Sequence, residues 1–179
     1  MAISLDGLDP AFRAKVEELL TALKAIGVDM RPYFGLRTLE QQAILWRQSR
    51  SKEEIAAAID KLKSANAGFL ADVLHSVGPQ HGPHVTNALP GLSWHQWGEA
   101  LDCFWSLNGS AEWSVSKIAD GINGYKVYAN LAKEMGLNAG GHWNSFKDWP
   151  HVQMRAAGSP IGAGMTLAEI DAVMRKRFG

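Results

Sequence analysis

The chain has 179 residues, a length typical of one domain, and 46% of them are hydrophobic, which is enough to bury a core. Eighteen basic residues balance eighteen acidic ones, and this excludes a nucleic-acid binder that depends on a broad basic surface. No segment approaches the roughly 18 consecutive apolar residues of a transmembrane helix. The single cysteine excludes an internal disulfide and any zinc site built from several cysteines.

The N-terminal part predicts one helix and one strand. Asp9 is a suitable N-cap, Pro10 fits the first helical turn, apolar residues then recur at helical spacing, and Gly27 ends the helix. The following stretch, 28–36, is predicted to be extended, and Pro32 within it indicates an edge strand or an irregular one.

Capping signals predict most of the remaining helices. Thr38 begins a capping box for a helix to about residue 50, and Ser51 with Glu54 begins another. The second box opens an apolar segment, 51–77, that we expect to divide into two helices at 66–68. The other expected elements are a loop over 78–92, strands near 100–105, 137–139 and 151–155, a helix over 116–135, and a capped helix over 166–178.

Helices therefore flank a few short strands without the regular alternation of a parallel sheet. This order predicts an α+β fold, and we find no linker or repeat that would divide it, so we expect a single domain over 1–179. Six of the seven tryptophans lie between Trp94 and Trp149, and we expect the functional site in that region.

Two short segments of this region carry groups that can bind a metal. His95 and Asp102 lie seven residues apart, and Asp148 precedes His151 by three. Two imidazoles and one carboxylate are a common ligand set for a catalytic zinc, and the remaining carboxylate would accept a proton from the zinc-bound water. A histidine in a tryptophan-rich stretch is also often a packed core residue, so on the residues alone both interpretations stay open.

The strand that follows His95 has a clear alternation. Ala100, Asp102 and Phe104 are predicted to face one way, with the intervening residues on the other face. Cys103 is therefore expected to be buried and unreactive. Glu99 is a competing candidate for the base, but we expect it to be exposed.

Three motifs resemble those of the zinc D,D- and L,D-peptidases of peptidoglycan. Residues 93–102 fit the pattern Ser-x-His-x-x-Gly-x-Ala-x-Asp. Residues 148–151 fit an acidic residue two positions before Pro-His, and residues 35–42 read Gly-Leu-Arg-Thr-x-x-x-Gln. The family includes D-Ala-D-Ala carboxypeptidases and dipeptidases, and phage endolysins that cut L-alanyl-D-glutamate bonds. The resemblance implies a hedgehog/DD-peptidase-like fold with a small antiparallel sheet flanked by helices.

The resemblance also implies roles for individual residues. His95, Asp102 and His151 would bind one zinc ion, Asp148 would be the general base, and Arg37 would stabilise the oxyanion of the tetrahedral intermediate. A fixed guanidinium suits that last role because it donates hydrogen bonds where negative charge develops.

Further residues are assigned by their neighbourhood to these motifs. Gln42 and Ser93 are expected to support the site. Trp94 and Trp149 each adjoin a zinc ligand and are candidates for substrate contact, as is His142 in a Gly-Gly-x-Trp segment. Trp97, Trp105, Trp113 and Trp143 are expected in the core and the cleft wall. The segment of about 51–77 departs from the family, many of whose members have only a short turn there.

The implied function is a zinc-dependent peptidoglycan peptidase acting on stem peptides. An L-alanyl-D-glutamate endopeptidase serving as a phage or prophage endolysin is our first choice, and a D-Ala-D-Ala carboxypeptidase the second. A non-catalytic, zinc-stabilised wall-binding module, as in the hedgehog signalling domain, is the rival of a different class. The N-terminus shows no signal peptide, so we expect a protein that is made in the host cytoplasm and reaches the wall after release. We also expect a monomer that has no stable insertion in the membrane and does not bind nucleic acid.

Overall fold

In the computed structural model, which describes residues 3–179, the first helix is α1 (Pro10–Ala25), and it begins as the sequence predicts. The Asp9 carboxylate accepts hydrogen bonds from the backbone N–H groups of Ala11 and Phe12, at 2.9 and 3.2 Å. This satisfies two of the donors that a helix start leaves without partners. The helix buries Phe12, Val16, Leu19 and Leu23.

The strands form one antiparallel sheet. Its order is β1 (Met30–Phe34), β2 (Ala100–Leu107), β5 (His151–Gln153) and β4 (Asn138–Ala139), and β3 (Ser110–Glu112) pairs with β2. The predicted extended stretch with Pro32 is β1, which lies at an end of this order. We did not predict β3, which follows a turn at Asn108 and Gly109, both with positive φ (52° and 81°).

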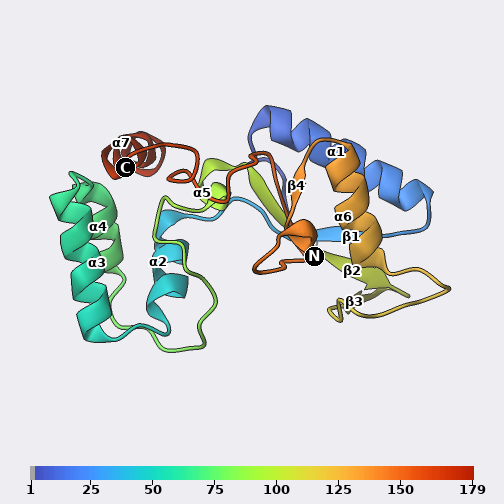
Figure 1. Cartoon of the computed structure of the whole chain (residues 1–179), viewed down its shortest axis with the longest axis horizontal. Coiled ribbons are helices and arrows are strands. Elements are labelled where there is room, and N and C mark those ends of the chain that lie inside the picture. The colour runs from blue at the N-terminus through green and yellow to red at the C-terminus, as the bar shows by residue number, and fades with distance from the viewer. Residues whose placement is uncertain (1–2) are drawn as a thin grey trace. The chain divides into compact units, whose positions relative to one another are not determined.

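One face of this sheet is covered by α1 and α6 (Gly124–Glu134) (Figure 1). Leu101 and Cys103 of β2 and Val152 of β5 belong to the same buried cluster as the apolar residues of these helices. Because side chains alternate along a strand, the residues between them point to the opposite face. The predicted alternation of β2 is confirmed, and it leaves Asp102 on the face away from α1 and α6.

The helix predicted over 116–135 begins eight residues later than expected. Asp120 and Gly121 have positive φ (50° and 78°), and Ala119 pairs with Ile122 in an isolated bridge. These backbone angles are incompatible with a right-handed helix, so the chain turns before α6 starts. Asn123 then caps α6 by accepting a hydrogen bond from the N–H of Lys126, at 2.9 Å.

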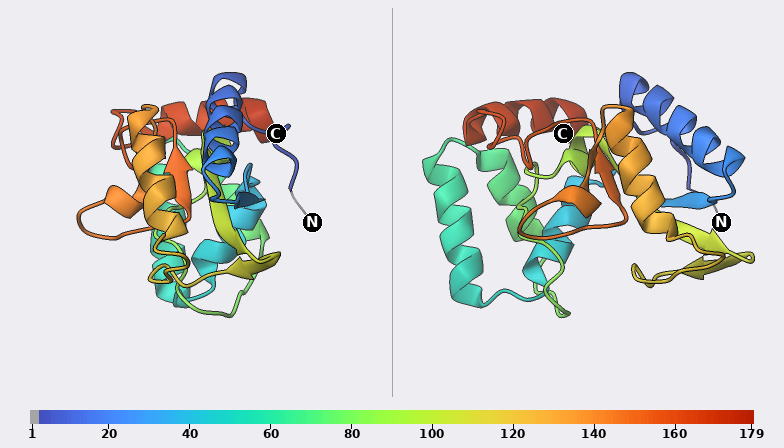
Figure 2. Two further views of the ribbon diagram at one scale, coloured as in Figure 1. Left: turned by 90° about the vertical axis from the view of Figure 1, so that its right-hand side faces the viewer. Right: turned by 45° about the vertical axis from the view of Figure 1, so that its right-hand side comes forward.

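Capping boxes start three further helices, as predicted. Both reciprocal hydrogen bonds of the box are present before α2 (Leu39–Arg47), α3 (Lys52–Ser64) and α7 (Leu167–Phe178). The predicted division of 51–77 is also confirmed: α4 (Gly68–Ser76) follows a break at Asn66, whose φ is 57°. Figure 2 shows α3 and α4 as a helical hairpin, and these two helices pack against each other.

Within residues 3–179 the contacts divide the chain into two compact units. The first unit contains the residues up to Leu36 together with Trp97–Ala156, and so holds the sheet, α1 and α6; the second contains Arg37–Gln96 and Ala157–Gly179. The predicted α+β class is confirmed, whereas one domain over the whole chain stays a prediction. Among the helices of the described residues, none combines the length and the apolar character needed to cross a membrane.

Candidate metal centre

Asp102 and His151 lie directly opposite each other on the paired strands β2 and β5. The Asp102 Oδ1 atom lies 2.9 Å from Nδ1 of His151, and both residues are buried. Their strand neighbours Leu101 and Val152 point into the core on the helical face of the sheet. The register of the sheet therefore brings a carboxylate and an imidazole together on the opposite face.

The second ring nitrogen of His151 also has a partner. Its Nε2 atom lies 3.0 Å from Oε1 of Gln153, a residue that is 1% exposed. Trp143 packs against the ring, with 5.1 Å between the ring centroids. Burial of the imidazole opposes its protonation, but the hydrogen bond and charge of Asp102, with the charge of Asp148, outweigh it, so the pKa of His151 is raised. The three motifs do not include Gln153, although its spacing of two from His151 on a predicted strand was an available signal.

His95 lies on a helical turn that we had not predicted, α5 (Trp94–Trp97). The turn is fixed by side chains at its start: the N–H of Ser93 donates to Oε1 of Gln96 at 3.1 Å, and the N–H of His95 donates to Oγ of Ser93 at 3.4 Å. Gly98, with φ of 73°, then turns the chain toward β2.

His95, Asp102 and His151 form a group that could hold a metal ion in the described part of the chain. Each offers one ligand atom, and these atoms lie within 4.8 Å of one another, with all three residues buried. Three tetrahedral zinc ligands at about 2.0–2.1 Å from the ion lie roughly 3.3 Å apart, so the ligand atoms of such a site must be close neighbours. The two nitrogens and one oxygen leave a fourth position for water or substrate, and the residues present fit a catalytic zinc.

Asp148 is held beside this group by the backbone. Its N–H donates to the carbonyl oxygen of Gly140 at 3.0 Å, and its own carbonyl oxygen accepts from the N–H of His151 at 3.1 Å. Gly140 opens the short 3-10 helix η1 (Gly140–His142), and a Cβ at this position would collide with the carbonyl oxygen of Asp148. The glycine is needed for this approach, which leaves the Asp148 carboxylate half-buried, with its charge acting on His151.

Arg37, Gln42, Ser93 and His95 belong to one hydrogen-bonded group. The N–H of Arg37 donates to the carbonyl oxygen of His95 at 3.2 Å, and Nη1 of Arg37 donates to Oε1 of Gln42 at 2.9 Å. The same Gln42 oxygen accepts from Nε2 of Gln96 at 3.1 Å. Gln42 is fully buried and donates to the carbonyl oxygen of Ala88 at 2.6 Å.

These hydrogen bonds are a physical basis for the supporting roles that the resemblance implied for Gln42 and Ser93. Gln42 holds the Arg37 guanidinium, and Ser93 holds the start of the turn that carries His95. Gln96 joins the two parts and was missed, because no local pattern distinguishes it from any other glutamine in a short helix.

The three candidates for substrate contact have different environments. Trp94 is buried, and its indole N–H donates to the carbonyl oxygen of Ala157 at 2.7 Å. Trp149 is half-buried and packs against the core of the sheet, with Lys147 over its ring. His142 is exposed at the end of η1. Contact of these residues with substrate stays a prediction.

Three side-chain expectations can be compared with burial. Trp113 was expected in the core or cleft wall, but 54% of it is exposed. Glu99 was expected to be exposed, but it is buried and forms a bidentate ion pair with Arg155, at 2.5 and 2.8 Å. Cys103 is buried as predicted, and burial raises the pKa of its thiol to about 12, so it stays protonated.

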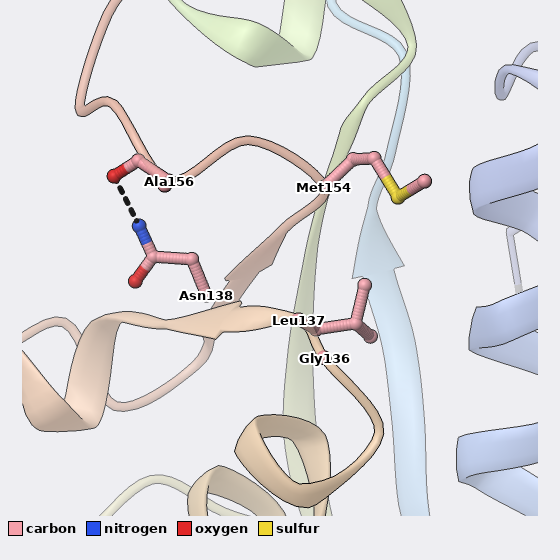
Figure 3. Close-up of a pocket in the computed structure, with 5 residues that line it drawn as sticks. All are labelled: Gly136, Leu137, Asn138, Met154 and Ala156. Carbon is pink, nitrogen blue, oxygen red and sulfur yellow. Dashed lines mark hydrogen bonds between the residues drawn. The ribbon is translucent and has the colours of Figure 1, made fainter.

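A surface pocket lies at the edge of the sheet where β4 begins and β5 ends (Figure 3). It has a volume of about 380 Å³ and is lined by Gly136, Leu137, Asn138, Met154 and Ala156. None of these five residues carries a titratable side chain or a nucleophile. The pocket therefore lacks the groups for hydrolysis, which are concentrated around His151.

Comparison with known proteins agrees with the motifs. Residues 6–139 match the family model described as VanY, D-alanyl-D-alanine carboxypeptidase. This range includes Arg37, His95 and Asp102, whereas Asp148 and His151 lie beyond its end. The chain is 26% identical over 150 residues to the peptidoglycan L-alanyl-D-glutamate endopeptidase CwlK of Bacillus subtilis (strain 168), covering 82% of this chain and 73% of CwlK.

Two solved structures match most of the chain. The L-Ala D-Glu endopeptidase ChiX of Serratia marcescens is 20% identical, with a TM-score of 0.47 and coverage of 84% of this chain and 83% of ChiX. A D,D-pentapeptidase VanY from a VanB-type resistance cassette, solved in complex with Zn(II), is 19% identical, with a TM-score of 0.47 and coverage of 91% and 83%. The family model spans well over half of the chain, so the expected family is confirmed: the protein is a peptidase that belongs to the VanY family of D-alanyl-D-alanine carboxypeptidases.

Proposed function

We propose that the chain is a zinc-dependent peptidoglycan endopeptidase that cuts the bond between L-alanine and D-glutamate in the stem peptide. The observation that carries the hydrolytic part is the buried group of His95, Asp102 and His151, with the Asp148 charge acting on His151. The choice of bond is supported by the identity to CwlK, which is named for this bond.

The roles of the side chains follow from their chemistry. Zinc bound by the three ligands would supply Lewis acidity to the scissile carbonyl and lower the pKa of a water molecule. The Asp148 carboxylate takes the proton of the attacking water and returns it to the leaving amine. The Arg37 guanidinium, held by Gln42, donates hydrogen bonds to the oxygen on which negative charge develops.

The second candidate is a D-Ala-D-Ala carboxypeptidase, and the description of the matching family favours it. The same side chains serve either bond, because both reactions are hydrolyses of an amide. The two differ in product: the endopeptidase releases a peptide with a new N-terminal D-glutamate, whereas the carboxypeptidase releases free D-alanine.

Mass spectrometry of the products from purified peptidoglycan tests this proposal. We expect soluble peptides that begin with D-glutamate, no release after the metal is removed with a chelator, and recovery when Zn²⁺ is added back. Release of D-alanine alone would replace the endopeptidase by the carboxypeptidase. Intact peptidoglycan in the presence of Zn²⁺, together with binding of the protein to the wall, would favour a non-catalytic binding module.

The endolysin role is a separate part of the proposal. We expect expression in the cytoplasm of a Gram-negative host to cause lysis when the inner membrane is also permeabilised, which lets the expressed enzyme reach the wall. An Asp148→Ala variant expressed to the same level is the control, and lysis by this variant would contradict the role.

Light scattering after gel filtration tests the expected monomer.

A further inference from the structure

Gln153 lies beside His151 through the geometry of β5. The two residues are separated by Val152, whose side chain points into the core, so His151 and Gln153 share the other face of the strand. The Oε1 atom of Gln153 lies 3.0 Å from Nε2 of His151, and Gln153 is 1% exposed. A buried amide this close to a predicted zinc ligand determines which nitrogen of the imidazole ring carries the hydrogen.

The orientation of the Gln153 amide follows from a second hydrogen bond, to the backbone of Arg155. Its Nε2 atom lies 2.6 Å from the carbonyl oxygen of Arg155, and a backbone carbonyl can only accept a hydrogen bond. The NH₂ group of the amide must therefore point to Arg155, and its oxygen must point to the imidazole. An amide oxygen is also only an acceptor, so Nε2 of His151 must carry the hydrogen.

The other ring nitrogen is thereby left to the metal. A neutral imidazole carries one hydrogen, so a hydrogen on Nε2 leaves the lone pair on Nδ1. The Nδ1 atom lies 2.9 Å from Oδ1 of Asp102, and two atoms with lone pairs approach this closely only with a cation or a proton between them.

We propose that Gln153 is a positioning residue that fixes the His151 ring with its hydrogen on Nε2 and so directs the Nδ1 lone pair to the zinc ion. This inference rests on the proposed zinc centre and names a residue that none of the three motifs contains. Residues that orient zinc-bound histidines in this way typically change metal affinity by about 10–100-fold when they are replaced.

The test compares two substitutions of Gln153. Gln153→Met keeps the length of the side chain but removes the acceptor, and we expect zinc affinity to fall by about 10–100-fold. Gln153→Glu keeps an acceptor for the ring N–H, and we expect affinity at least equal to that of the unmodified protein, since carboxylates commonly orient zinc-bound histidines. Both affinities are measured by competition with a chromophoric chelator.

Asn138 offers a matched control for general damage to this part of the sheet. It lies opposite Gln153 in the register of β4 and β5, and its amide donates to the carbonyl oxygen of Arg155 at 3.2 Å. The amide also donates to the carbonyl oxygen of Ala156 at 2.9 Å, the bond drawn in Figure 3. Asn138→Asp keeps the Oδ1 acceptor of the Trp143 indole N–H, at 2.9 Å, but removes the two hydrogen bonds that the amide donates. We expect this variant to loosen the same segment while leaving zinc affinity unchanged.

A spectroscopic measurement identifies the ring nitrogen directly. In the zinc-loaded protein, ¹⁵N NMR of the histidine rings should show a hydrogen on Nε2 of His151, which Gln153→Met would no longer fix. Unchanged zinc affinity in Gln153→Met, or zinc on Nε2 of His151, would overturn the role of Gln153 alone. Failure of the unmodified protein to bind zinc would overturn the proposed metal centre as well.

Discussion

The two compact units hold their functional side chains in different ways. In the first, Asp102, His151 and Gln153 are fixed by the register of β2 and β5 and by the alternation of side chains along each strand. In the second, Arg37 and His95 are fixed by buried amides and by the backbone of a single helical turn. Sheet register fixes positions through many backbone hydrogen bonds, whereas a side-chain network depends on each of its members.

The largest loss is expected from Asp148, whose position depends on the backbone of the first unit. Asp148→Ala should lower kcat by about 100–10,000-fold, the usual contribution of a general acid-base residue. Zinc content measured by mass spectrometry should stay at the level of the unmodified protein, since Asp148 is not among the three ligands. Asp148→Asn, which keeps the shape of the side chain, should lose as much activity. Substantial activity in either variant would move the role of base to another residue.

Arg37 tests the second unit, and its replacement should cost less. Arg37→Ala should lower kcat by about 100–1,000-fold, as the loss of an oxyanion donor does elsewhere. Arg37→Lys should recover only part of this, because an ammonium lacks the planar arrangement of donors.

Gln42 then shows whether the network matters beyond the guanidinium itself. Gln42→Leu removes the acceptor of the Arg37 hydrogen bond and should reproduce part of the loss in kcat, with zinc content unchanged. Full activity of Gln42→Leu in steady-state assays would show that Arg37 is held by other contacts.

Gly140 tests how closely the backbone of the first unit is fitted around Asp148. An alanine Cβ would collide with the Asp148 carbonyl oxygen, so Gly140→Ala should destabilise the protein by about 1–3 kcal/mol in chemical unfolding and also lower activity. Gly158→Ala is the matched control, because a Cβ there meets nothing within 4 Å. Equal stability of the two variants would mean that the segment of Asp148 shifts freely.

The same contrast explains which features the sequence predicted. Local signals were reliable: the N-cap at Asp9, the three capping boxes and the alternation of β2 all depend on residues within a few positions of one another. The late start of α6 follows from Asp120 and Gly121, whose positive φ angles turn the chain before the helix begins.

Features that depend on distant partners were missed. The Glu99 ion pair joins residues 56 positions apart, and the Gln42 amide reaches Ala88 across 46. His95, Asp102 and His151 were predicted because a family resemblance supplied the long-range information that spacing lacks. Gln153 lies outside those motifs, and its hydrogen bond to His151 became evident only in the structure, although both residues fall on one face of a predicted strand.

The smallest predicted effect is a loss of stability at low pH at the starts of α3 and α7, two helices of the second unit. Hydrogen bonds from the backbone N–H groups of Ser51 and Thr166 lower the pKa values of Glu54 and Glu169 from their ordinary value of 4.5. A carboxyl group whose pKa is lowered by folding stabilises the folded state above its unfolded pKa, and this contribution is lost as the pH falls through the folded pKa. The capping boxes should therefore weaken below about pH 4.5.

Glutamine at these two positions separates this effect from other acid effects, because it can form the same capping hydrogen bond without titrating. The double variant Glu54→Gln and Glu169→Gln should lose less thermal stability between pH 7 and pH 3 than the unmodified protein. Hydrogen exchange should locate the difference in α3 and α7, while the amides of β2 and β5 respond equally in both proteins. An identical acid response of α3 and α7 in the two proteins would show that charge on the capping carboxylates adds nothing to the hydrogen bond. The starts of α3 and α7 would then depend on the geometry of the capping hydrogen bond rather than on charge.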